Sequence, residues 1–232
     1  MVISEFHQEF KILVDKTDSL NYTDFLPEEI DIYLNKAIEK FISQRAYGNN
    51  PRREGIEETQ KRFDDLITLV TNYSLSTFTT TNAKPNGVIA ALPSDYWHTL
   101  EEDVTISYPD CNNVTSTKVV PVIPVTHDKY NKIIRDPFNK PDNSKVVRMG
   151  LNGSMELISG TGVTITTYKL RYIRKPAVVS YGTTYSTVGT DTQCDLPVST
   201  HKEIIAMAVQ IALGTIEAKT YPVSVQENAT IE

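Results

Sequence analysis

The stretch from Phe25 to Gly48 reads FLPEEIDIYLNKAIEKFISQRAYG and decides the fold of the chain. Its apolar residues recur at three- and four-residue steps, which places them on one stripe of an α-helix. They are Ile30, Leu34, Ala37, Ile38, Phe41 and Ile42. Pro27 suits a first helical turn, where its missing N–H is no loss, and Gly48 is a stop signal. The stretch predicts a packing helix and contains no catalytic constellation.

Two further amphipathic helices are predicted beside it. Ser4 can cap a first helix, whose apolar face is Phe6, Phe10, Leu13 and Val14. A third helix is predicted after Pro51, with the apolar face Ile56, Phe63, Leu66, Ile67 and Val70. Short links between three such helices indicate a helical layer with antiparallel neighbours.

Strand signals dominate the middle of the chain. Residues 72–87 are rich in Asn, Ser and Thr and predict a loop or a loose hairpin. The β-branched run Val119–Val125 contains two prolines, which confines it to a sheet edge. Asn152-Gly153 predicts a two-residue hairpin and Gly160–Gly162 a second tight turn, while residues 126–134 predict a short helix.

The last predicted element is a helix after Pro197, where Thr200 and Glu203 have the spacing of a capping box. One face carries Ile204, Ala208, Ile211, Ala212 and Thr215. The opposite side is also apolar, with Ile205, Met207, Val209 and Leu213. A helix that is apolar nearly all round is buried on all sides. Either a second subunit covers one side, or this is the central core helix of a single chain.

This order of elements predicts an α+β fold, in which an antiparallel β domain is inserted into a helical bundle of three N-terminal helices and one C-terminal helix. The predicted domains are residues 1–72 with 195–221 for the bundle and 73–194 for the β domain. Residues 222–232 are expected to form a C-terminal tail.

The net charge of −6 argues against a protein whose main function is nucleic-acid binding. The charge is unevenly distributed. Residues 118–175 hold eleven Lys/Arg against four Asp/Glu, a net +7, so the remainder carries −13. Such polarity is either an ordinary solvated surface or the basis of contacts between an acidic face and a basic face on neighbouring copies.

No secretory signal and no apolar run long enough to span a membrane are visible, and the chain has only two cysteines. These features predict a chain made and folded in a cytoplasm. None of the four histidines has a second ligand-type residue at metal spacing, so no metal or cofactor is expected. Cys111 lies in a predicted loop without a nucleophile signature. The Glu101-Glu102-Asp103 run is better explained as exposed charge than as a glycosidase pair.

The basic stretch Lys169–Lys175 interleaves cations with aromatic residues, a pattern also found in nucleic-acid binders. Strand alternation places Lys169, Arg171 and Lys175 on one face, and a strand with one solvated face is the favoured interpretation. These cations and the second face of the C-terminal helix are the predicted subunit-interface residues. They are Ile205, Met207, Val209, Leu213, Lys169, Arg171 and Lys175.

Four stretches taken in order resemble a known family: LPEEI at 26–30, LPSDY at 92–96, RDPFNKP at 135–141 before LRYIRKP at 170–176, and CDLP at 194–197. Together they resemble ring or adaptor proteins of the head-to-tail connector in short-tailed, crAss-like phages. The resemblance covers about residues 22 to 218. It implies a non-enzymatic virion component without cofactors that forms a homo-oligomeric ring, commonly of twelve copies. The ring joins the portal protein to other connector or tail proteins, with DNA only as passing cargo and no membrane contact.

The sequence therefore predicts a head-to-tail adaptor or tail-ring subunit, made in the host bacterial cytoplasm and located in the virion. One alternative is a receptor- or glycan-binding module of the tail, because twelve Tyr and a loop-rich β block could form a binding surface. A cell-wall hydrolase is a third hypothesis, which requires a carboxylate pair or a Cys-His pair in one pocket.

Overall fold

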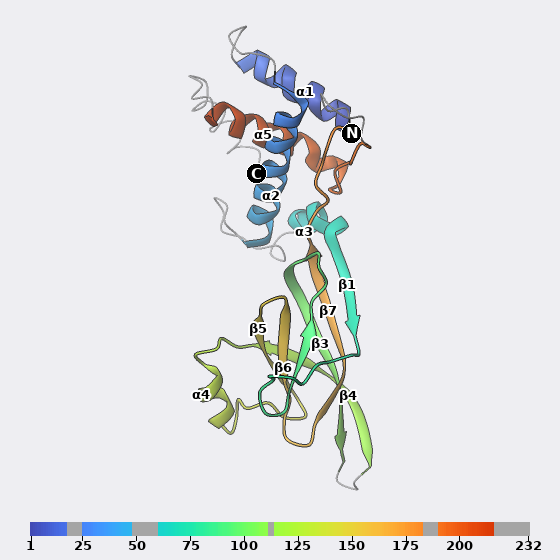
Figure 1. The fold of residues 1–232 in the computed structure, drawn as a ribbon, viewed down its shortest axis with the longest axis vertical. Helices are drawn as coiled ribbons and strands as arrows, with labels where there is room; N and C mark the ends of the chain where they lie inside the picture. The colour runs from blue at the N-terminus through green and yellow to red at the C-terminus, as the bar shows by residue number, and fades with distance from the viewer. Residues whose placement is uncertain (18–24, 48–59, 111–113, 183–189, 216–232) are drawn as a thin grey trace. The chain divides into compact units, whose positions relative to one another are not determined.

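The computed structural model describes residues 1–17, 25–47, 60–110, 114–182 and 190–215 (Figure 1). The chain divides into two compact units. The helical unit consists of residues 1–69 and 176–232, and the sheet unit of residues 70–175. The boundaries predicted from sequence, at 72/73 and 194/195, lie further along the chain at both points. Helices and a curled mixed sheet make the fold α+β, which confirms the predicted fold class.

The helical unit contains helices from both ends of the chain. The described elements are α1 (Ile3–Thr17), α2 (Pro27–Tyr47), α3 (Gln60–Leu66), the 3-10 turns η1 (Ile67–Leu69) and η2 (Val198–Thr200), and α5 (His201–Thr215). Helix α5 packs against both α1 and α2. The six apolar residues predicted to form the stripe of α2 are all at most 2% exposed, so that prediction is confirmed.

The predicted third helix is wrong in its second half. Helix α3 ends at Leu66, a 3-10 turn follows, and Val70 already begins strand β1. Ile67, placed on the buried face by the helical period, is 50% exposed. The reason is the change from helix to 3-10 turn after Leu66, which shifts the side chains off the helical period. The predicted start after Pro51 lies outside the described residues.

At both predicted capping motifs, the structure shows other hydrogen bonds than the predicted ones. Helix α1 begins at Ile3, so Ser4 is inside its first turn, and the N–H of Val2 donates to Glu5 at 3.0 Å. Helix α5 follows directly on a 3-10 turn, in which the Thr200 hydroxyl donates to the Pro197 carbonyl at 2.9 Å. Glu203 instead accepts a hydrogen bond from Arg45 at 2.7 Å.

The sheet unit is a seven-stranded sheet with the order β1-β7-β3-β4-β5-β6-β2. Its strands are β1 (Val70–Leu75), β2 (Gly87–Ala91), β3 (Tyr96–Pro109), β4 (Thr115–Pro124), β5 (Val146–Leu151), β6 (Ser154–Ile158) and β7 (Thr164–Arg174). The curl of the sheet encloses an apolar core in which Tyr168 and Val104 are fully buried. The short helix α4 (Tyr130–Arg135) starts later than the predicted span of 126–134.

The predicted purely antiparallel sheet is corrected by one parallel pair, β4 with β5. Strand β4 is also not at an edge. It pairs with β3 up to Pro121 and with β5 from Val122 to Pro124. Each proline lacks one ladder donor, and the strand accommodates Pro121 at the point where it changes partner. The edges of the sheet are β1 and β2.

The two predicted turns are confirmed. Strands β5 and β6 are joined by Asn152-Gly153, with Leu151 opposite Ser154 and Gly153 at φ +65. Gly162 has φ +77 in the second turn, which Val163 closes by donating to the Gly160 carbonyl at 3.2 Å. Positive φ strains residues with a Cβ, so glycine suits both positions.

Candidate assembly surface

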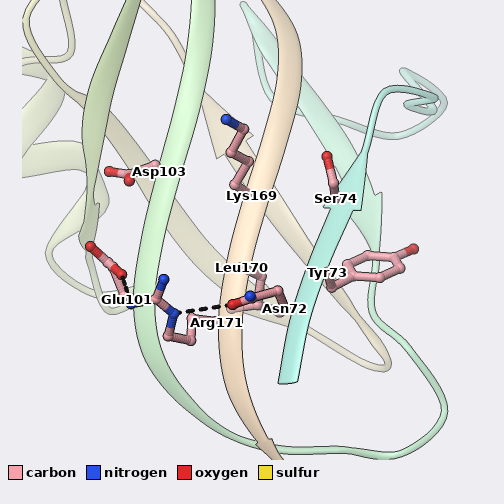
Figure 2. Close-up of a pocket in the computed structure, with 8 residues that line it drawn as sticks. All are labelled: Asn72, Tyr73, Ser74, Glu101, Asp103, Lys169, Leu170 and Arg171. Carbon is pink, nitrogen blue, oxygen red and sulfur yellow. Dashed lines mark hydrogen bonds and ion pairs between the residues drawn. The ribbon is translucent and has the colours of Figure 1, made fainter. Parts of the chain in front are cut away.

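Three neighbouring strands of the sheet unit, β1, β7 and β3, present one continuous polar face (Figure 2). Their registers form two rungs across the three strands. Asn72 lies opposite Arg171, which lies opposite Glu101. Ser74 lies opposite Lys169, which lies opposite Asp103. We call these six residues the polar face.

The polar face follows from the two-residue period of a strand, because alternate side chains point to opposite sides. On β7, Lys169 and Arg171 are exposed, whereas Tyr168, Leu170 and Tyr172 are buried in the core. The prediction that Lys169 and Arg171 share one solvated face is confirmed. Lys175 is exposed too, but it lies one residue beyond β7 and does not line the pocket on this face.

The polar face contains a shallow pocket of about 310 Å³, lined by its six residues with Tyr73 and Leu170. Arg171 bridges the first rung: Nη1 lies 2.8 Å from Glu101 Oε2, and Nε donates to Asn72 Oδ1 at 3.1 Å (Figure 2). Both ionic side chains are more than half exposed, so the pair stabilises the fold by only about 0–1 kcal/mol. Its cation and carboxylate therefore remain accessible to a partner.

Two members of this face were assigned wrongly from the sequence. Asn72 and Ser74 fall in the stretch 72–87, predicted to be a loop or a loose hairpin, but belong to strand β1. Strand β7 supplies the backbone partners that their weak strand propensity does not predict. Glu102 was grouped with exposed charge, yet its side chain is 5% exposed. It accepts hydrogen bonds from Arg148 and from Tyr168 at 2.6 Å. Strand alternation was the signal that could have separated Glu102 from Glu101 and Asp103.

The four predicted interface residues of α5 belong to the helical unit. Ile205 and Leu213 are fully buried, and Met207 and Val209 are each 6% exposed. Since the single chain already covers these side chains, the core-helix alternative explains their apolar character without a second copy. Their assignment to a subunit interface stays a prediction.

The described histidines are dispersed and occupy structural positions. His201 Nε2 lies 2.9 Å from the Leu196 carbonyl oxygen, and His127 Nε2 lies 2.9 Å from that of Gly150. Burial lowers the pKa of His201 and of His98 and raises the pKa of the Cys194 thiol. Over the part of the chain that the structure describes, no three His, Cys, Asp or Glu side chains gather as a metal site requires. Cys111 lies outside the described residues.

Comparison with known proteins identifies the family. The family model described as "Phage tail ring protein 3/4" matches residues 1–222. The chain belongs to this phage tail ring protein family. The resemblance to crAss-like phage ring proteins, stated above from four sequence stretches, is thereby confirmed.

Two relatives in Bacteroides phage crAss001 support the assignment over nearly the whole length. "Ring protein 4/5" is 28% identical over 231 residues, covering 91% of this chain and 92% of the relative. "Ring protein 3" is 25% identical over 225 residues, covering 92% of this chain and 95% of the relative. The tail ring family match makes the chain a structural component of a phage virion. None of the helices described combines the length and apolar character that crossing a membrane requires.

Proposed function

We propose that this tail ring protein forms a homo-oligomeric ring of twelve copies that acts as a head-to-tail adaptor. In this role the ring joins the portal protein to the other tail proteins around a channel through which DNA passes. The observation that carries the proposal is the family match over residues 1–222. No enzymatic step or cofactor belongs to this function.

A ring needs two different contact surfaces on each subunit, because every copy meets its two neighbours head to tail. The two units of this chain differ in charge as such surfaces require. The helical unit carries eleven Lys/Arg and twenty Asp/Glu, a net −9, and the sheet unit carries twelve and nine, a net +3. We propose that the polar face, with Lys169 and Arg171, contributes to one of the contacts. Complementary charges select the partner and the register more than they add affinity.

A net charge of −6 also suits a conduit for DNA, because a wall that bound phosphates tightly would hinder passage. The alternative of a receptor- or glycan-binding module is not favoured. The pocket of the polar face is lined largely by charged and small polar side chains, with Tyr73 as its single aromatic residue.

The proposal is tested by native mass spectrometry of the purified chain, alone and with the portal ring encoded by the same genome. We expect a closed multimer that loads onto the portal ring and whose mass gives twelve copies. If the chain does not bind the portal ring, the adaptor role is wrong. If it forms a closed multimer of another size, the copy number of twelve is wrong.

The contribution of the polar face is tested with the double variant Lys169→Ala and Arg171→Ala. We expect it to weaken assembly in the same measurement. The matched control is Lys118→Ala, which removes an exposed cation from β4 outside the polar face. If the double variant assembles as well as the wild type, the polar face does not contribute to the contact between copies.

A further inference from the structure

The segment from Lys129 to Lys145 contains α4 and the turns that lead to β5, and we call it the arm. No residue of α4 is buried, and the arm contains Phe138, which is 86% exposed and thus the most exposed large apolar side chain among the described residues. Figure 1 labels α4 within the sheet unit. Aromatic residues and Arg are enriched in protein–protein interfaces relative to the rest of the surface, so a Phe this exposed beside cations is a candidate contact.

Phe138 is held by hydrogen bonds on both sides. Its N–H donates to Asp136 Oδ1 at 3.0 Å, and the Asn139 side chain donates to Asp136 Oδ2 at 2.6 Å. The Lys145 ammonium donates to the Phe138 carbonyl at 2.7 Å. The bond from Asn139, with that from Phe138, lowers the pKa of Asp136, which keeps this carboxylate in its accepting form. These bonds fix the backbone of the turn from which the ring projects, which lowers the entropy that the backbone loses on binding.

The arm is strongly basic. It holds five cations and two carboxylates, and both carboxylates, Asp136 and Asp142, accept hydrogen bonds within the arm. Lys129, Lys132 and Arg135 are all exposed and follow one another at three-residue steps, so they share one side of the short helix. The arm thus combines a row of cations with an exposed aromatic ring on a hydrogen-bonded turn.

A surface with the opposite character lies on the helical unit. Along α1 and the residue before it, Val2, Glu5, Glu9 and Ile12 recur at helical steps on one outer stripe. Val2 and Ile12 are 50% and 51% exposed, Glu5 is exposed and Glu9 half-buried. We call these four residues the acidic stripe. It offers two carboxylates between two apolar side chains, which matches the arm in charge and in apolar content.

We propose that the arm of one copy docks on the acidic stripe of the next copy, with Phe138 against the apolar side chains and Lys132 and Arg135 against Glu5 and Glu9. This proposal rests on the ring function and names one of its head-to-tail contacts. The arm and the stripe are different surfaces, so the contact is heterologous and can propagate around a ring. The occupant is a second copy because its acidic stripe supplies both the carboxylates and the apolar groups.

The decisive experiment reverses the charges on each side separately and then mixes the two products. Arm variant Lys132→Glu with Arg135→Glu has an acidic arm, and stripe variant Glu5→Lys with Glu9→Lys has a basic stripe. Each purified alone pairs like charges, so assembly should weaken at least tenfold. In the mixture, the acidic arm meets the basic stripe and the unaltered arm meets the unaltered stripe. Native mass spectrometry should then show restored rings in which the two variants alternate.

The control for the charge change is Lys118→Glu with Lys202→Glu, two exposed positions outside both surfaces, and it should assemble like the wild type. The apolar part is tested by Phe138→Ser, which should weaken assembly about tenfold or more. Val114→Ser, at a position that is 62% exposed, is its control. Circular dichroism confirms that each variant is folded.

The possible outcomes separate this inference from the ring function. If the wild type assembles but the mixture shows no restoration, the docking proposal is wrong and the ring remains. If the arm variant assembles with itself and loses only the portal ring, the occupant is the portal protein and the proposal is likewise overturned. A wild type that assembles neither alone nor on the portal ring overturns both.

Discussion

The helical unit and the sheet unit use buried polar side chains for different purposes. In the helical unit, Arg45 on α2 binds Asp65 on α3 at 3.2 Å and Glu203 on α5 at 2.7 Å. In the sheet unit, Glu102 on β3 binds Arg148 on β5 and Tyr168 on β7. The first network joins helices that no backbone hydrogen bond connects. The second joins strands of a sheet that the backbone ladder already holds together.

The difference follows from where the backbone hydrogen bonds of helices and strands are made. A helix bonds its own N–H and C=O groups internally, so only side chains determine how helices pack. A strand bonds its neighbours, so the sheet keeps its order when one side chain is lost. Disruption of buried polar networks should therefore cost more in the helical unit. The experiments below test that comparison, beginning with the largest effect.

Arg45→Ala is expected to have the largest effect. Arg45 is 2% exposed, and its loss leaves the buried Asp65 carboxylate and the half-buried Glu203 carboxylate without this cation. Breaking a buried pair in this way costs about 3–5 kcal/mol. Hydrogen exchange read by mass spectrometry should show faster exchange in α2 and α5, with strand β7 unchanged. Lys40→Ala, an exposed change on α2, is the control. Equal acceleration of exchange in β7 would contradict a cost confined to the helical unit.

Tyr168→Phe is expected to have a smaller effect, in the sheet unit. It removes the phenol that donates to Glu102, while Arg148 remains in place. The buried carboxylate loses one donor, which costs about 1–3 kcal/mol in the free energy of unfolding by urea. Tyr172→Phe removes a similar bond to the half-buried Asp95, where water can replace the phenol, and should cost less. If Tyr168→Phe lowers the free energy of unfolding as much as Arg45→Ala does, the expected larger cost in the helical unit is wrong.

Gly153→Ala tests the backbone of the sheet unit directly. Gly153 has φ +65 and its added Cβ would meet no atom within 4 Å, so the cost is the left-handed backbone alone, about 1–2 kcal/mol. Gly150→Ala, three residues earlier in the same hairpin, also meets no atom within 4 Å and has no positive φ. Thermal unfolding should separate the two variants. Equal stability would mean that the hairpin relaxes to remove the strain.

The smallest effect concerns pH and the helical unit. Burial lowers the pKa of His201, which packs 4.8 Å from the ring of Phe6. The unfolded chain then binds a proton at a higher pH than the folded chain, so this contribution to stability is present above pH ~6.5 and is lost as pH falls below it. Urea unfolding between pH 7.5 and pH 5 should show a weaker pH dependence for His201→Gln than for the wild type. His127→Gln, at an exposed position, is the matched control for the substitution.

Local pattern was enough to predict several elements and one part of the candidate surface. The buried stripe of α2, the Asn152-Gly153 hairpin and the alternation of Lys169 and Arg171 with buried residues all depend on periods of a few residues. Such periods are set by the geometry of a single helix or strand. The family resemblance likewise came from the order of short sequence stretches and was confirmed.

Only the tertiary structure determined the features that require a contact between residues distant in the sequence. Asn72 and Ser74 are in a strand because β7 lies beside them, and β4 is central because β5 pairs with its last residues. Glu203 binds Arg45 instead of capping its own helix. In each case a contact between remote residues outweighs a local preference of about 1 kcal/mol or less. The sequence by itself determined the periodic elements and the family, and the tertiary contacts determined which polar groups are buried, paired or exposed.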